Sequence, residues 1–441
     1  MKKIIFLLLF VILNNCSFDN KTGIWKNSNE ADVSQENRFK DFETLYSEEK
    51  TFNEIILPRK NLIINFKKIK KILRWEDEFY HQSNNLDNFS YENLNKLIFK
   101  SKKLSRFKIK DKILFDGNNI ILSDVKGNII VYSINDQEIN FKYNFYKNKF
   151  KKLNKKLSII VERNIIYVSD NMGYIYAINY SSKKLLWAKN FKIPFRSNLK
   201  LTEDYIILSD QNNSLLIVNK VTGDRVKIFP TEETTIKNDF INSIALNNDS
   251  ILFLNTYGSF YSVDKQNFNI NWLVNLNESI DLNNRNLFYS NSIIFDNKLI
   301  AISTDPYLYV INAVSGITLF KLPITSIVNP IISGNNLFLV TKDNLIVCLD
   351  LTEKKINYSL NINSLIAKFV NTKKKEVNIK HLFIAKDKIY LFLDNSYIIR
   401  LSATGSIEKI DKLKEKLFSK PIFVNDSILY INNKNKLIVL N

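Results

Sequence analysis

Apolar and polar residues alternate along most of this chain in a pattern that predicts β-hairpins. In one segment, 164–187, the apolar residues 165–168 lead into a polar turn that ends at Gly173, and the apolar residues 175–178 carry the chain back. A further polar turn leads to a third strand that ends on Trp187. The segment is therefore predicted to form three strands of one antiparallel sheet.

The same unit recurs with a period of about 44 residues, a length typical of one blade of a β-propeller. With Gly173 as a register mark, the residue two positions later is apolar in every copy, and the residue six positions later is a short polar residue that suits a turn. Six of the seven residues fourteen positions after a mark are large and apolar, and we interpret them as packing residues; Lys227 is the exception. The sequence thus predicts an all-β fold, an eight-bladed β-propeller. The eight marks are Gly127, Gly173, Asn213, Gly258, Pro306, Asn344, Ser396 and Asn435.

The eighth copy reaches Asn441 before its last strand could form. An exposed strand edge is normally paired or covered by another part of the chain. An orphan strand at about 67–75, ending in Trp75, precedes the first copy. We therefore expect this N-terminal strand to complete the last blade and close the ring. Between the orphan strand and the first copy, residues 76–103 are expected to form a loop with one or two strands of the first blade.

The first residues have the pattern of an export signal. Two lysines precede an apolar run over 4–13, which as a helix spans about 15 Å, too little for a bilayer core of about 30 Å. Cys16 follows this run, where a bacterial lipoprotein signal is cut and the cysteine acylated, for example with palmitate. We predict a lipoprotein signal peptide over 1–15, a lipid anchor on Cys16, a flexible tether over 16–53 and the propeller over 54–441. A plain secretory signal is the alternative.

The chain has a net charge of +19 and few chemically reactive side chains. Because the lysines are scattered over all repeats, a solvated surface is favoured over a nucleic-acid site, although attraction to anionic lipid stays open. If Cys16 is acylated, Cys348 has no partner for a disulfide. The two histidines, His81 and His381, show no metal-ligand spacing, so no metal site is predicted. The acidic run 76–78 is interpreted as solvent-facing loop charge, and no catalytic residue is predicted.

A further pattern carries a resemblance to known proteins. The unit Gly-x-apolar-Tyr-Ala-apolar-Asn, followed by a turn and a tryptophan, resembles the PQQ-type propeller repeat, best at 173–187 and 258–272. Together with the export signal and the number of repeats, it resembles the BamB family, propeller lipoproteins of the outer-membrane β-barrel assembly machinery. The opening CSFDNKTGIW at 16–25, the segment IPFRSN at 193–198 and the closing stretch from Pro421 are similar to α-proteobacterial members.

This resemblance implies a non-enzymatic scaffold without a cofactor, anchored at the periplasmic face of the outer membrane. Members of the family bind the periplasmic domains of BamA, act with other assembly subunits, and help to deliver unfolded outer-membrane proteins. Their BamA-facing residues lie in loops after the third and fourth repeats. The matching positions in this sequence are Ile236 and Lys237 in the first loop and Asp281 and Arg285 in the second.

Two other functions stay open from the sequence. A PQQ-dependent dehydrogenase would share the repeat, but such enzymes usually carry adjacent cysteines, a calcium-binding acid and a tryptophan floor beneath the quinone. The chain has no adjacent cysteines and no tryptophan beyond Trp272. The third possibility is a periplasmic propeller that binds cell-wall glycan or peptide without catalysis.

Overall fold

The computed structural model describes residues 16–18, 25–27, 52–146, 150, 152–233, 241–277, 288, 293–371 and 376–441. The chain divides into two compact units, Met1–Lys50 and Thr51–Asn441. In the first unit, Cys16–Phe18 (β1) pairs antiparallel with Trp25–Asn27 (β2), so a short hairpin lies within the predicted tether. The predicted signal peptide lies outside the described residues. The described part of the chain contains no helix long and apolar enough to cross a bilayer.

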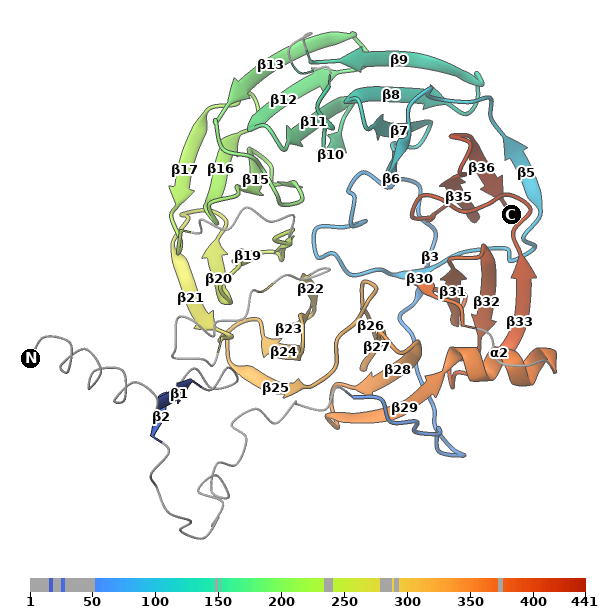
Figure 1. Cartoon of the computed structure of the whole chain (residues 1–441). Helices are drawn as coiled ribbons and strands as arrows, with labels where there is room; N and C mark the ends of the chain where they lie inside the picture. Colours follow the sequence, from blue (N-terminus) through green and yellow to red (C-terminus); the bar gives the residue numbers. More distant parts are fainter. Residues whose placement is uncertain are drawn as a thin grey trace, which may run out of the picture. The chain divides into compact units, whose positions relative to one another are not determined.

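The second unit is built almost entirely from β-strands, which confirms the all-β prediction. Its described part holds eight sheets, and Figure 1 shows them following one another around a common centre. Seven of these sheets have four strands, and one has six. Listed in hydrogen-bonded order within each sheet, the strands are Ile109–Phe115 (β6), Asn119–Asp124 (β7), Asn128–Ser133 (β8) and Glu138–Asn144 (β9); Leu157–Glu162 (β10), Ile165–Asp170 (β11), Tyr174–Asn179 (β12) and Lys184–Asn190 (β13); Lys200–Leu201 (β14), Tyr205–Ser209 (β15), Leu215–Asn219 (β16) and Arg225–Phe229 (β17); Ile244–Leu246 (β18), Ser250–Leu254 (β19), Ser259–Asp264 (β20) and Ile270–Asn275 (β21); Ile293–Asp296 (β22), Leu299–Ser303 (β23), Leu308–Asn312 (β24) and Thr318–Leu322 (β25); Ile331–Ser333 (β26), Asn336–Val340 (β27), Leu345–Asp350 (β28) and Lys355–Asn361 (β29); Ile69–Lys70 (β3), Asn88–Phe89 (β4), Ile379–Ala385 (β30), Lys388–Leu393 (β31), Tyr397–Leu401 (β32) and Ile407–Lys412 (β33); Ile422–Val424 (β34), Ser427–Ile431 (β35), Leu437–Leu440 (β36) and Leu97–Lys100 (β5).

Each register mark lies in the turn between the second and third strands of its sheet, except Ser396, which lies between β31 and β32, the fourth and fifth strands of the six-stranded sheet. Seven of the eight marks have a positive φ, from +58° at Asn344 and Asn435 to +87° at Gly258, and Pro306 is the exception. Glycine and asparagine tolerate this left-handed conformation better than other residues, which explains their recurrence at the marks. An aspartate or asparagine three positions earlier caps several of these turns: the Oδ1 atom of Asp170, for example, accepts hydrogen bonds from two backbone N–H groups of its turn, at 2.8 Å each.

The large residues fourteen positions after a mark join neighbouring sheets, as the packing interpretation predicted. The Nε1–H group of Trp187 donates to the backbone oxygen of Lys220 in the next sheet at 3.1 Å. The indole ring lies so close to Gly223 that a Cβ atom there would come within 2.4 Å of it. Trp272 repeats the arrangement in the following pair of sheets. Lys227, the exception in the sequence pattern, also reaches the next sheet, where its ammonium donates to the Phe268 oxygen at 2.7 Å.

The last sheet takes its fourth strand from the N-terminal part of the chain, but from a different strand than predicted. β5 pairs antiparallel with β36. The predicted orphan strand instead contributes β3 to the six-stranded sheet, and Trp75 forms a bridge with Phe115 in the first sheet. The expectation that residues 76–103 would add strands to the first blade was also wrong, because β4 joins β30 and β5 joins β36. Trp75 thus shares its residue type with the tryptophans fourteen positions after a mark, but not their position in a sheet.

A stretch that we call the central segment, residues 75–89, crosses the middle of the ring and contacts the innermost strands in turn (Figure 1). The Leu246 N–H donates to Gln82 at 2.8 Å, the Phe295 N–H to Ser83 at 3.0 Å, and the Lys386 N–H to Phe89 at 3.0 Å. Side chains extend the pattern: Asn84 donates to oxygens of Ile244 and Ile293, and Asn85 exchanges two hydrogen bonds with Ile332. The central segment therefore satisfies inner-strand groups that face the middle of the ring.

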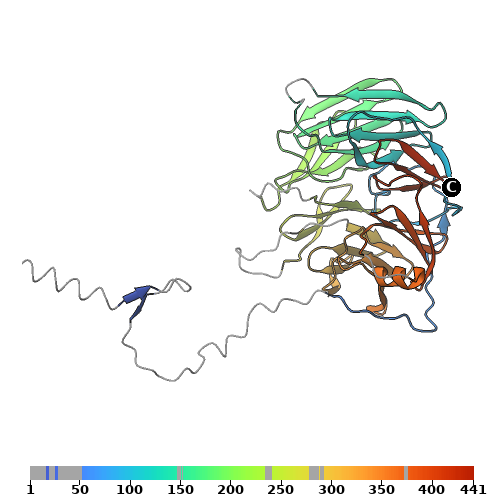
Figure 2. The same ribbon diagram turned by 45° about the vertical axis from the view of Figure 1, so that its right-hand side comes forward.

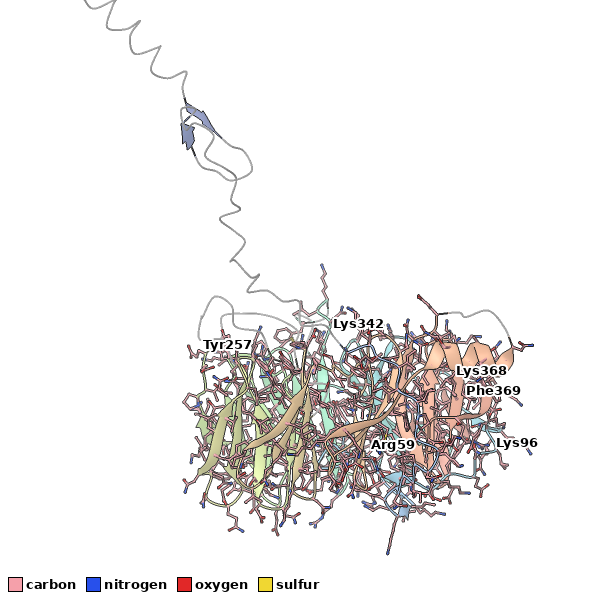
Figure 3. All side chains as sticks on the ribbon, turned by 90° about the horizontal axis from the view of Figure 1, so that it is seen from below. Arg59, Lys96, Tyr257, Lys342, Lys368 and Phe369 are labelled. Atoms are coloured by element: carbon pink, nitrogen blue, oxygen red, sulfur yellow. The ribbon has the colours of Figure 1, made fainter. Side chains whose placement is uncertain are left out.

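The second unit has two faces, and the central segment lies toward one of them. The segment contacts Phe115, Leu246 and Ala385, each the last residue of an inner strand, where the chain turns into the second strand. In an antiparallel sheet the turns between the second and third strands lie at the opposite end. That opposite side, with the register-mark turns, the connections between sheets and the helix Ile362–Val370 (α2), is called the connection face. Figure 3 shows Tyr257, Lys342 and Lys368 together on this side.

Helix α2 connects the sixth sheet along the chain to the next one. Asn361 caps its N-terminus by accepting a hydrogen bond from the Ser364 N–H group, and Asn371 ends it in the left-handed conformation. The helix packs beside β29 and β33 (Figure 2). Ile362 is buried, whereas Phe369 and Val370 are half exposed.

Candidate functional site

The two connections predicted to face a partner protein leave the connection face from neighbouring sheets. One joins β17 to β18, and the other joins β21 to β22. The four predicted contact residues, Ile236, Lys237, Asp281 and Arg285, lie outside the described residues. The positions where both connections attach to the sheets are described, and they form one hydrogen-bonded framework.

Asn213 is the centre of this framework. It is a register mark with φ +68°, and it is fully buried. Its Oδ1 atom accepts hydrogen bonds from Arg196, from Asn242 at 3.2 Å and from the Thr256 hydroxyl at 2.7 Å. Its Nδ2 group donates to the Glu232 oxygen at 3.0 Å. One asparagine therefore ties the start of the first connection, at Glu232, to its end, at Asn242.

The second connection is attached to the same framework through Thr256. The Phe288 N–H group donates to the Thr256 oxygen at 2.7 Å, and the Leu276 N–H group donates to the Gly258 oxygen at 2.8 Å. The Phe288 ring lies against Gly258, where a Cβ atom would come within 2.8 Å of it. Since Thr256 also binds Asn213, the flanks of both connections meet at one place on the connection face.

Arg196 joins two register-mark turns of the framework. Its guanidinium donates to Asn213 of one turn and to the Thr256 hydroxyl of the next. Burial lowers the pKa of Arg196, and the nearby Asp210 carboxylate opposes that change. The arginine lies in the IPFRSN segment that carried part of the family resemblance. Its role as a bridge between two turns was not predicted, although a lone arginine beside a proline and an aromatic residue in a connection was a visible signal.

The acidic run 76–78 was wrongly interpreted as solvent-facing. Asp77 and Glu78 lie in the central segment and are only 7% and 8% exposed. Asp77 forms an ion pair with Lys200 at 2.6 Å, and Glu78 forms one with Lys112 at 2.7 Å. Burial is the largest influence on the pKa of Lys200 and lowers it, while the Asp77 carboxylate counteracts it. These carboxylates were missed because their lysine partners lie far away in the sequence.

The described residues do not fit a quinone site of the dehydrogenase type. Trp187 and Trp272 are used in contacts between neighbouring sheets, and Trp75 is 1% exposed against Tyr80 and Phe89. Cys348 is buried within β28. Among the described residues, no three histidine, cysteine, aspartate or glutamate side chains lie together where they could hold a metal ion.

Comparisons with known proteins agree with this architecture. Residues 145–359 match the family model described as outer membrane protein assembly factor BamB, and this span contains both connections. Curated protein sequences gave no significant match. The crystal structure of BamB from Moraxella catarrhalis is similar to this chain with a TM-score of 0.60 and 11% sequence identity, covering 78% of this chain and 99% of that one.

Enzymes and a designed protein share the fold as well. A quinohemoprotein alcohol dehydrogenase from Comamonas testosteroni has a TM-score of 0.60 and 7% identity, covering 83% of this chain and 80% of that one. The computationally designed Ika8 protein has a TM-score of 0.58 and 10% identity, covering 78% and 99% of the two chains. At such identities these likenesses concern the fold alone. In its repeats and its fold, this chain is similar to the outer membrane protein assembly factor BamB.

Proposed function

We propose that this chain is a non-enzymatic scaffold of the outer-membrane β-barrel assembly machinery, of the α-proteobacterial BamB type. Its eight sheets are the blades of a closed propeller, and β5 completes the last blade. The observation that carries the proposal is the match to the BamB family model over residues 145–359, together with the framework at Asn213 that joins the flanks of both connections.

In this proposal the two connections bind the periplasmic domains of BamA through Ile236, Lys237, Asp281 and Arg285. The framework at Asn213 favours such a role, because it holds the flanks of the two connections in a fixed relation and so lowers the entropic cost of binding. The protein acts with other assembly subunits and with unfolded outer-membrane proteins. It is held at the periplasmic face of the outer membrane by lipid on Cys16.

The dehydrogenase alternative arises because two structurally similar proteins are dehydrogenases, the quinohemoprotein alcohol dehydrogenase above and a europium-containing methanol dehydrogenase with a TM-score of 0.57. The described tryptophans and Cys348 argue against it, since their contacts are taken up by the fold. Titration with pyrroloquinoline quinone and calcium tests this alternative directly. Binding with alcohol-dependent dye reduction would favour the enzyme over the scaffold.

The scaffold is tested by a pull-down from native membranes with a tag after Asn441, followed by mass spectrometry. We expect BamA to be recovered with the unchanged protein. Alanine at Ile236, Lys237, Asp281 and Arg285 together is expected to lower that recovery by about tenfold or more, because interface energy concentrates in a few residues.

A chemically matched control has alanine at Val221, Lys184, Asp204 and Arg225. These residues are exposed at strand ends and turns away from the connection face, so the control is expected to recover BamA fully. A membrane-bound protein that recovers no BamA would refute the scaffold, and a binding assay with cell-wall glycan would then test the remaining alternative. If the fourfold variant and the control lose BamA recovery equally, binding of BamA through the connection face would be refuted.

A further inference from the structure

The apolar face of helix α2 is only partly covered by the fold. This face has the i, i+3, i+4, i+7 and i+8 spacing of one helix side and consists of Ile362, Leu365, Ile366, Phe369 and Val370. Ile362 is buried, and Leu365 and Ile366 pack against the core of the neighbouring sheets. Phe369 and Val370, one turn further on, are 50% and 51% exposed. The last turn of the helix therefore presents apolar surface that the described part of the protein does not cover.

Unpaired positive charge surrounds this last turn on the connection face. Lys368 lies on the helix itself, and Lys342 lies in the register-mark turn of the sixth sheet; both are exposed, and Figure 3 shows them on the same side. Other exposed lysines lie at the same end of the seventh sheet and in the connection that follows it. Together the exposed lysines of this region, none of which forms an ion pair with a described residue, are Lys342, Lys368, Lys380, Lys412, Lys414 and Lys416.

Lysines toward the opposite side of the same two sheets are neutralised. Lys355 pairs with Glu353 at 2.9 Å, and Lys388 pairs with Glu408 at 2.5 Å. Near helix α2, by contrast, the described carboxylates are fewer than the lysines, and one of them is already paired with Lys100. These carboxylates are Asp343, Glu376, Asp394 and the paired Glu415. An excess of positive charge therefore surrounds the exposed apolar turn.

The N-terminal part of the second unit is attached at the same face. The Phe52 N–H group donates to the Pro323 oxygen at 3.0 Å, in the connection between β25 and β26. From there the chain passes the outer edge of the sixth sheet and reaches the opposite side at Asn65, whose oxygen lies against Gly334 in the turn after β26. Cys16, the proposed lipid anchor, thus precedes a point of attachment on the connection face.

Apolar side chains surrounded by unpaired lysines match the chemistry of an anionic bilayer surface. The lipid headgroups offer negative charge, and the boundary between headgroups and acyl chains accepts apolar side chains. A second copy of this chain is a poorer occupant. A symmetric contact between two copies would bring two positively charged surfaces together, and their repulsion would oppose the contact.

We propose that the last turn of helix α2 docks on an anionic lipid surface. Phe369 and Val370 enter the boundary between headgroups and acyl chains, and Lys342 and Lys368 lie against the lipid phosphates. This inference rests on the membrane attachment in the proposed function and adds an orientation of the propeller on the membrane. Because a lipid anchor raises the local concentration of the bilayer, a weak contact is sufficient to orient the protein. The proposed BamA-binding connections join the third, fourth and fifth sheets, so they are separate from this surface.

Fluorescence quenching by brominated lipid tests the docking. The full-length protein is coupled through the Cys16 thiol to a maleimide lipid in vesicles of anionic phosphatidylglycerol brominated near the headgroup; Cys348 is buried and does not compete. The tryptophan of Phe369→Trp is expected to lose about half of its emission, because the headgroup boundary brings it into contact with bromine. Val314→Trp is the matched control. Val314 is 74% exposed in the turn between β24 and β25, on the side opposite the connection face, so no quenching of its replacement is expected.

Charge variants test the role of the lysines. Glutamine at both Lys342 and Lys368 in the Phe369→Trp protein is expected to lower the quenching by about half or more, because attraction to the anionic headgroups is lost. Glutamine at both Lys184 and Lys298 removes the same charge from exposed positions on the opposite side. This control is expected to leave the quenching unchanged.

Equal quenching of the two introduced tryptophans, no quenching in Phe369→Trp, or equal quenching in neutral phosphatidylcholine vesicles would each overturn the proposal. A blue shift of the Phe369→Trp emission that grows with protein concentration without vesicles would assign the turn to contact between copies, and would also overturn it. BamA takes no part in this measurement. Quenching together with a failed pull-down would therefore refute the scaffold alone, and BamA recovery without quenching would refute the docking alone.

Discussion

Individual residues at the junctions between sheets carry much of the specificity of this fold. Gly223 is needed for two separate reasons: its φ is +74°, and the Trp187 ring occupies the space where a side chain would begin. Gly117 has φ +110° but meets its nearest neighbours only at 3.8 Å. Substitutions at the two glycines therefore separate the cost of backbone strain from the cost of displacing a closely packed side chain.

Gly223→Ala is expected to lower the free energy of unfolding by about 2–4 kcal/mol, because strain adds to displacement of a packed indole ring. Gly117→Ala is expected to cost about 1 kcal/mol, from strain alone. Urea denaturation of both variants measures the difference. If the two variants lose equal stability, the close contact of Trp187 with the next sheet contributes nothing to the free energy of unfolding.

His381 on β30 makes stability depend on pH. Burial, with Lys420 and Lys380 nearby, lowers the pKa of His381 to about 3, from an ordinary value of 6.5. The folded protein therefore keeps this imidazole neutral where the unfolded chain takes up a proton. The contribution to stability is complete above pH 6.5 and is lost as the pH falls toward 3.

Between pH 6.5 and 3, the unchanged protein is expected to lose up to about 1.4 kcal/mol per pH unit more than His381→Gln does. Urea denaturation at a series of pH values gives this difference, and carboxylate titrations common to both proteins cancel. His81→Gln is the comparison: burial also lowers the pKa of His81, but less than that of His381, so this variant is expected to differ less from the unchanged protein. Parallel pH profiles for the unchanged protein and His381→Gln would contradict the assignment.

Among the elements, the central segment is the one that local sequence patterns did not predict. The hairpins were predictable because their turns require glycine or asparagine at the marks and because apolar residues repeat along the strands. The central segment has no such period, and its partners are backbone groups of inner strands far away in the sequence. β5, within the stretch where one or two strands were expected, was assigned to the wrong sheet for a related reason, because its partner β36 lies far away in the sequence.

A substitution at Asn84 measures how much the central segment contributes to the stability of the fold. It is 1% exposed, and its Nδ2 group donates to the Ile244 oxygen at 3.0 Å and the Ile293 oxygen at 2.9 Å, in two neighbouring sheets. Asn84→Asp replaces this donor by an oxygen facing two carbonyls, so we expect a loss of about 3 kcal/mol or more. Asn248→Asp, at an exposed turn, is expected to change stability by less than about 0.5 kcal/mol.

Thermal and urea unfolding of both asparagine variants give the comparison. A stable Asn84→Asp protein would mean that the central segment is held by other contacts and does not fasten the inner strands.

At the scale of the whole molecule, the sequence predicted the repeat, the fold class and the position of the two connections, but not the framework at Asn213. Repeats are visible because each copy buries the same positions. That framework depends instead on side chains from turns and connections that meet only after folding, among them Arg196 and Thr256. Their contacts cross between sheets and give no periodic signal in the sequence.

The pairing of β5 with β36 sets the order in which this molecule can be completed. Synthesis delivers β5 long before its partner β36, and the Leu437 N–H group reaches the Ser101 hydroxyl across 336 positions. Contacts of such long range form late, because the loop they close is costly in entropy. The growing chain therefore carries an unpaired strand edge from the synthesis of β5 until that of β36, and such an edge can pair with another chain in the meantime.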